Sequence, residues 1–138
     1  MKDAILVDTN VLIYAVDADS RFHEQAIKFL SDSALKLFTT SKNVSEFLVV
    51  LTRNSEVELS ASECLDILNS LLNDIVILYP TPASMNVFQE LVHKYNPRGL
   101  WIHDVEIASI AIAYGISMIA TNNIADFKRI DELKIIEI

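Results

Sequence analysis

Short apolar runs alternate along the chain with longer segments in which apolar residues recur every three or four positions. The run over residues 4–7 is apolar throughout and ends at Asp8, which is typical of a strand buried on both faces of a parallel sheet. Segments of the second kind predict helices that bury one face. The strands are predicted over residues 4–7, 35–40, 75–79, 117–121 and 134–137. The helices are predicted over residues 11–16, 22–30, 41–53, 61–72, 82–95 and 103–114, with a short helix before the last strand.

The order of these elements predicts a three-layer α/β sandwich with a mostly parallel central sheet. A length of 138 residues, of which 51% are hydrophobic, fits one domain over residues 1–138. Either Ser60 or Ser62 is expected to cap the helix over residues 61–72. Because ligands of such sheets bind beyond the carboxyl ends of the strands, we expect the chemistry at that edge.

The composition argues against several classes of protein. The net charge of −8 argues against a protein that coats nucleic acid, because such proteins neutralise phosphates with an excess of positive charge. Asp3 precedes an apolar run of only four residues, so we expect neither a secretory signal nor a membrane span. Cys64 is interpreted as a buried small hydrophobe rather than a nucleophile, which fits a reducing cytoplasm.

Three acidic residues occupy positions where the pattern leads us to expect an apolar side chain. Asp8 ends the most apolar strand, Glu46 lies in a helix that is apolar almost all round and therefore predicted to be buried, and Asp104 shares a stripe with apolar residues. Each also has an ordinary structural explanation. Asp8 and Asp104 are suited to the first turn of a helix, and Glu46 is spaced to pair with Lys42 or Arg53.

Taken together, the three acids are expected at the same edge of the sheet, where a strand ends or a following helix begins. Three carboxylates about 5 Å apart repel by about 3 kcal/mol per pair at an effective dielectric constant of 20. Protonation or a bound cation removes that repulsion. Oxygen ligands without a His or Cys cluster indicate Mg²⁺ or Mn²⁺ rather than zinc.

Four segments, which together span essentially the whole chain, resemble in order the four signatures of PIN-domain nucleases. They are VDTNVL at 7–12, SEF at 45–47, HD at 103–104 followed by IASIA at 107–111, and TNNIADF at 121–127. A single-domain chain of this length is most similar to the VapC-type toxins of bacterial and archaeal toxin–antitoxin pairs, which are Mg²⁺-dependent endoribonucleases.

The resemblance implies that the same three acids bind the metal. The family's fourth position, often Asp, is Asn123 here. Asn123 is still counted among the catalytic residues, because its carbonyl oxygen can bind the metal or orient a water, but a second metal held by four acids is not expected. Thr121 is expected to donate a hydrogen bond to a metal-binding carboxylate. Asp126 is expected to add negative charge near the metal ligands without binding the metal itself.

The resulting hypothesis is an endoribonuclease in which a metal-activated water hydrolyses RNA phosphodiester bonds. Four cations near the proposed active edge are predicted to contact phosphates: Lys42, Arg98, Lys128 and Arg129. Neither His23 nor His93 is expected to take part, whereas His103 is a candidate for supporting Asp104.

Two other readings start from the same residues. Aspartyl-phosphate phosphatases also carry an Asp at the end of a first strand, but they expect a second acid two residues later, where this chain has Asn10. A catalytically weak PIN-like module that binds RNA or acts as a scaffold is favoured by the missing acid at Asn123. The three retained acids argue against that module.

The resemblance also implies partners, namely an RNA substrate and a small antitoxin that blocks the active edge with a basic side chain. A homodimer is predicted because apolar residues recur along 65–72 and 87–91. Helix packing inside one monomer uses the same pattern, so both explanations of these two stripes stay open.

Overall fold

The computed structural model describes residues 3–53, 56 and 58–138. Its strands are β1 (Asp3–Val7), β2 (Leu35–Thr40), β3 (Ile75–Leu78), β4 (Met118–Ala120) and β5 (Lys134–Ile136). They form one sheet in the order β3-β2-β1-β4-β5, and every neighbouring pair is parallel. The predicted α/β fold is confirmed. β1 is the central strand, and β5 lies at an edge.

The helices begin and end close to the predicted positions. They are α1 (Thr9–Val16), α2 (His23–Leu30), α3 (Ser41–Thr52), α4 (Ala61–Leu71), α5 (Pro82–Tyr95), α6 (Trp101–Ala113) and α7 (Ile124–Phe127), with a short 3-10 turn η1 (Leu72–Asp74). Ser60 rather than Ser62 caps α4, since its hydroxyl accepts a hydrogen bond from the Glu63 backbone. α6 begins two residues earlier than predicted, and Asp104 still lies in its first turn.

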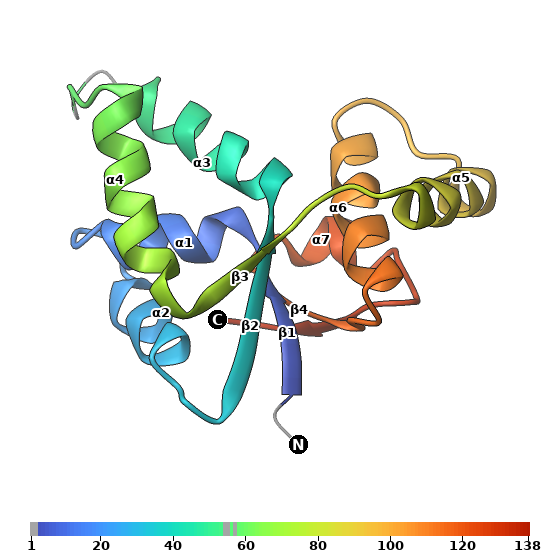
Figure 1. The fold of residues 1–138 in the computed structure, drawn as a ribbon, viewed down its shortest axis with the longest axis horizontal. Coiled ribbons are helices and arrows are strands. Elements are labelled where there is room, and N and C mark those ends of the chain that lie inside the picture. Colours follow the sequence, from blue (N-terminus) through green and yellow to red (C-terminus); the bar gives the residue numbers. More distant parts are fainter. Residues whose placement is uncertain (1–2, 54–55, 57) are drawn as a thin grey trace.

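The helices form two layers, one on each face of the sheet (Figure 1). The alternation of side chains along β1 divides the core accordingly. Ile5 and Val7 are buried in one cluster with residues of α1, α2, α3 and α4. Leu6 is buried in the other, with residues of α5, α6 and α7. The sheet is therefore covered on both faces, which explains why β1 is apolar from Ala4 to Val7.

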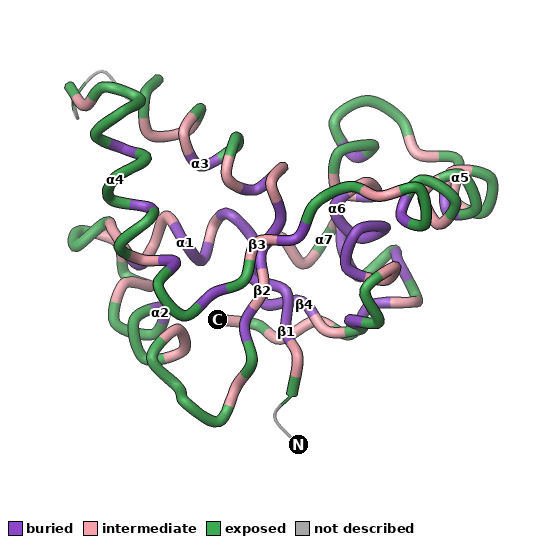
Figure 2. The backbone as a smooth tube through the Cα atoms, viewed as in Figure 1, coloured by how far each residue is buried: buried purple, intermediate pink, exposed green. Residues whose placement is uncertain are grey.

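One expectation about α3 was wrong. The pattern predicted a buried helix, yet only Asn43 and Phe47 of α3 are buried. Figure 2 shows most of α3 as intermediate or exposed. One side of α3 packs against α1 and α4, and the other faces an open cleft. The apolar residues on that open side include Val49, whose side chain is 54% exposed.

The two stripes considered for a dimer contact are used largely inside the monomer. Leu68 and Leu91 are buried in the two cores, whereas Leu65 and Ile67 stay 39% and 36% exposed. Cys64 is buried, as predicted. Within the described residues, no helix has the length and apolar character needed to cross a membrane.

Candidate active site

Asp8 is placed at the carboxyl end of the central strand, and only 5% of it is exposed. It is also the N-cap of α1, because its Oδ1 accepts a hydrogen bond of 2.9 Å from the Thr9 backbone N–H. The capping explanation for Asp8 is therefore correct. It does not compete with a role in chemistry, since the cap uses only one of the two carboxylate oxygens.

Three side chains hold the Asp8 carboxylate in addition to this cap. Asn43 donates from Nδ2 to Oδ1 at 3.1 Å, and Thr121 donates from its hydroxyl to Oδ2 at 2.7 Å. Asn10 donates to Oδ2 over a longer 3.3 Å. Asn43 is oriented in turn by the Thr40 hydroxyl, which donates to its Oδ1 at 2.6 Å. This network immobilises Asp8 and includes the hydrogen bond predicted for Thr121.

The roles of Asn43 and Asn10 were not anticipated from the sequence. Both positions carried a local signal, however. Asn43 stands three residues after Thr40, and the two side chains form a capping box at the start of α3. Asn10 follows Asp8 by two residues, and its Oδ1 also accepts the Asn122 backbone N–H at 3.2 Å. The capping box and the bond to Asn122 direct the amides of Asn43 and Asn10 toward the end of β1.

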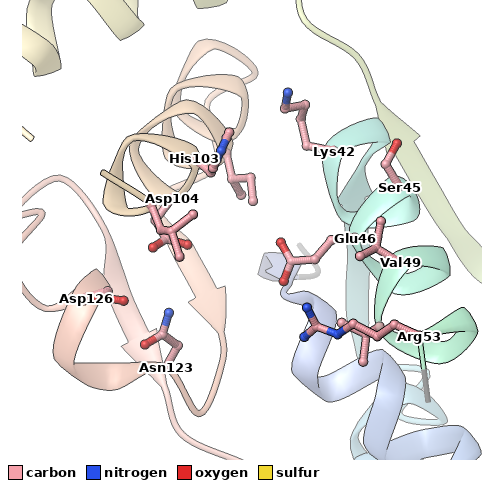
Figure 3. Close-up of a pocket in the computed structure, with 12 residues that line it drawn as sticks. Lys42, Ser45, Glu46, Val49, Arg53, His103, Asp104, Asn123 and Asp126 are labelled. Carbon is pink, nitrogen blue, oxygen red and sulfur yellow. The ribbon is translucent and has the colours of Figure 1, made fainter. Parts of the chain in front are cut away.

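Glu46 and Asp104 face each other from opposite walls of a cleft of about 580 Å³ (Figure 3). Glu46 projects from α3, and Asp104 projects from the first turn of α6. Asn123 and Asp126 line the same cleft beside Asp104. Asp104 does not cap α6, because the N-cap of that helix is Leu100 and makes no side-chain cap hydrogen bond.

The ion pair suggested for Glu46 is not formed by Lys42. The Lys42 Nζ instead lies 3.3 Å from Oε1 of Glu106, across the cleft on α6. Arg53 lines the cleft near Glu46, and its positive charge only partly opposes the rise in the pKa of that carboxyl that burial and Asp8 cause. Within the described part of the chain, Glu46 has no cation within ion-pair distance.

The acids influence one another's protonation. Burial raises the pKa of Asp8, and the hydrogen bonds described above oppose this rise. Burial and the charge of Asp8 raise the pKa of Glu46. Burial raises the pKa of Asp104 to about 7, with further contributions from the charges of Asp8, Asp126 and Glu46. The charges of these acids therefore act on one another, whereas their predicted role as metal ligands stays a prediction.

No three His, Cys, Asp or Glu side chains among the described residues are grouped closely enough to hold a metal ion as they stand. Two features keep these acids from forming a ready ligand group. Each oxygen of Asp8 already accepts two hydrogen bonds, and Glu46 and Asp104 lie on separate walls. The donor atoms still fit a hard divalent cation, because they are oxygens whose mutual repulsion a cation relieves. Binding a cation there requires side-chain movements, and the 3.3 Å Asn10 bond is the longest of the four that hold Asp8.

A family model described as PIN domain matches residues 5–133. The chain belongs to the PIN domain family. Among solved structures, VapBC2 from Rickettsia felis bound to a promoter DNA fragment matches with a TM-score of 0.75 and 21% identity over 98% of both chains. A toxin–antitoxin complex from Klebsiella pneumoniae matches with a TM-score of 0.67 and 18% identity, over 94% of this chain and 95% of that one.

VapC20 from Mycobacterium tuberculosis, described as a sarcin-ricin loop cleaving toxin, has a TM-score of 0.64 and 15% identity, over 83% of this chain and 86% of that one. At such identities the three likenesses show a shared fold. No curated protein sequence matches the chain. The PIN-domain resemblance predicted from the four sequence segments is thus confirmed.

The cations predicted to contact phosphate are not all placed in the cleft of this PIN domain. Lys42 lines the cleft, whereas Arg98, Lys128 and Arg129 are not among its lining residues. The Arg129 guanidinium instead lies 3.6 Å from the centre of the Trp101 ring. Arg53 lines the cleft although it was not among the cations predicted for this edge, and its spacing from Lys42 along α3 was a signal that the two share a face.

Proposed function

We propose that this protein is a divalent-metal-dependent endoribonuclease, with Mg²⁺ or Mn²⁺ as the cation, and that it is the toxin of a toxin–antitoxin pair. The observation that carries the proposal is that Glu46 and Asp104 line one cleft of a PIN domain, and that the charge of the buried Asp8, at the carboxyl end of β1, acts on both. VapC20, which shares the fold, is described as a toxin that cleaves the sarcin-ricin loop. That description supports RNA as the substrate class.

Each part of the cleft has a chemical task in this proposal. When bound, a divalent cation polarises a phosphate and lowers the pKa of nearby water. Asp8 presents a carboxylate whose orientation is held by its four hydrogen-bond donors. Asp104, with a pKa of about 7, loses its proton when positive charge arrives. Asn123 offers a neutral carbonyl oxygen where many relatives are expected to carry an acid.

A second candidate is a PIN-like module that binds RNA or acts as a scaffold without efficient turnover. Asn123 in place of an acid favours it, and so does the absence of a preassembled ligand group among the described residues. Incubation with a mixed RNA substrate and Mg²⁺ or Mn²⁺, with and without chelator, distinguishes the two. Cleavage that stops with chelator supports the enzyme, and binding without cleavage in either metal supports the module.

The products are expected to carry 5′-phosphate and 3′-hydroxyl ends. Cleavage through the 2′-hydroxyl usually requires a general acid and a general base, often two histidines. Of the three histidines, only His103 lines the cleft, and His23 Nδ1 lies 2.8 Å from the Tyr14 carbonyl oxygen elsewhere. Water is therefore the expected nucleophile. End-mapping of the fragments checks this, and 2′,3′-cyclic phosphate ends would contradict it.

An antitoxin partner is the second part of the proposal, supported by the toxin–antitoxin complexes that share this fold. We expect a small protein to co-purify from the native operon and to inhibit cleavage by placing a basic side chain among the carboxylates. Repeated purification of the protein alone would contradict the toxin assignment and leave the nuclease assignment standing. The homodimer stays a prediction, which the molecular mass in solution checks.

A further inference from the structure

Four residues of α3 and its C-cap form one stripe along the cleft. Lys42, Glu46, Val49 and Arg53 are spaced by four, three and four residues, so they share one face of the helix. All four line the cleft, and Figure 3 shows them on the wall opposite Asp104. The stripe therefore presents a cation, a carboxylate, an apolar side chain and a second cation in that order.

The permanent positive charge of the cleft is confined to this wall. Among the described lining residues, Lys42 and Arg53 are the lysine and arginine, and both belong to the α3 side. The opposite wall contributes Asp104, Asn123 and Asp126. In a chain with a net charge of −8, a polyanion has to be held by local cations. These two are the ones adjacent to the carboxylates.

The spacing places the two cations on opposite sides of Glu46 along the helix. Along the helix axis, Lys42 lies about 6 Å from Glu46 on one side and Arg53 about 10 Å from it on the other, at about 1.5 Å per residue. One phosphate cannot contact both cations and the carboxylates between them. Different phosphates of one strand can do so, with the phosphate that is cut lying between the other two.

Both cations are available for such contacts. Lys42 is paired with Glu106, but the two side chains are 39% and 29% exposed, and ion pairs this exposed contribute little stability. Arg53 is exposed and has no described carboxylate within ion-pair distance. Exchanging water or Glu106 for a phosphate therefore costs little in either case.

We propose that a single RNA strand lies along α3, with Lys42 binding a phosphate on one side of the cut and Arg53 a phosphate on the other. This rests on the proposed ribonuclease function and adds the path of the substrate and a role for Arg53. A single strand fits better than a duplex, because both cations lie on one wall and the acids of the other wall repel a second backbone.

Substitution of each cation tests the path through binding. In an Asp8→Asn background, which keeps a labelled single-stranded RNA intact, Arg53→Gln and Lys42→Gln are each expected to raise the Kd by about three- to ten-fold. Each is also expected to reduce the slope of log Kd against log salt by about 0.7. Lys28→Gln, on the exposed face of α2, is the matched control and should change neither quantity.

Neutral phosphate analogues locate the contacts. Methylphosphonate linkages placed singly along the RNA should weaken binding at one position on each side of the cut. Arg53→Gln should abolish the effect of one of these positions, and Lys42→Gln the effect of the other. If both variants respond to every linkage as the parent does, the path is wrong even though the RNA is bound.

Three further outcomes would overturn the path. If Arg53 serves only to neutralise Glu46, Arg53→Gln will change Mn²⁺ affinity by calorimetry without changing the response to neutral linkages. If the two cations serve a protein partner, RNA binding will be unaffected by either substitution. Equal affinity for duplex and single strand would exclude the single-strand preference. Failure of the wild-type protein to cleave any RNA would instead overturn the proposed function itself.

Discussion

Asp8→Asn is expected to reduce RNA cleavage by more than about a hundred-fold while leaving the fold intact. Substitutions behind a metal ligand typically cost about ten- to a hundred-fold, so loss of a ligand's charge should exceed that range. Asparagine has nearly the same shape and is as good an N-cap as aspartate, so α1 keeps its start. The expected result is a folded protein with little activity.

The stability of Asp8→Asn should differ from wild type by less than about 2 kcal/mol in metal-free buffer, because two effects oppose each other. Removing a buried charge favours folding, whereas the new amide N–H group faces the donors of Thr121 and Asn10. Circular dichroism, denaturant titration and single-turnover cleavage measure these quantities. Asp66→Asn, on the exposed side of α4, is the matched control. Wild-type cleavage rates in a folded Asp8→Asn protein would refute the site.

Asp104→Asn is expected to stabilise the metal-free protein at pH 8 by roughly 1–2 kcal/mol while abolishing cleavage. Burial and the charges of Asp8, Asp126 and Glu46 raise the pKa of Asp104 to about 7. Within the described residues, no donor is hydrogen bonded to its carboxylate. Asparagine therefore removes an unfavourable charge without breaking a hydrogen bond. Because solvent in the open cleft screens these charges, the gain in the free energy of unfolding should be smaller than the value that corresponds to the whole pKa shift.

The sign of the pH dependence follows from the raised pKa. An aspartate in the unfolded chain titrates near pH 3.9, whereas folded Asp104 keeps its proton until about pH 7. As the pH rises between these values, the unfolded chain releases its proton first, so the wild-type protein loses stability across that window. Asparagine does not titrate. The advantage of the variant should therefore be absent near pH 4 and complete above about pH 7.

Denaturant titrations in chelator at several pH values check this prediction, again with Asp66→Asn as the control. Added Mg²⁺ should raise the stability of the wild-type protein and have a smaller effect on the variant. An advantage that is the same at pH 4 and pH 8, or a variant that is less stable at pH 8, would show that Asp104 does not carry the unfavourable charge.

The sequence by itself determined the features that depend on spacing along the chain. An apolar run that ends in Asp8 predicts a central strand with an acid at its carboxyl end, because such a strand is buried on both faces. Helical periodicity and capping residues placed the helices to within a few residues. The four family segments indicated the PIN domain, which the family-model match confirms, and predicted which acids act together.

Only the tertiary structure decided which side chains meet across the cleft. Asn43 reaches Asp8 from 35 residues away, and Lys42 pairs with Glu106 rather than with the nearer Glu46. Arg129 packs on Trp101 instead of lining the cleft. Helical periodicity says which residues share a face, but the meeting of α3 with α6 depends on how two separate layers pack at the edge of the sheet. For the same reason, the sequence could predict the acids of the candidate site, whereas the open face of α3 and the position of Arg53 beside Glu46 required the fold.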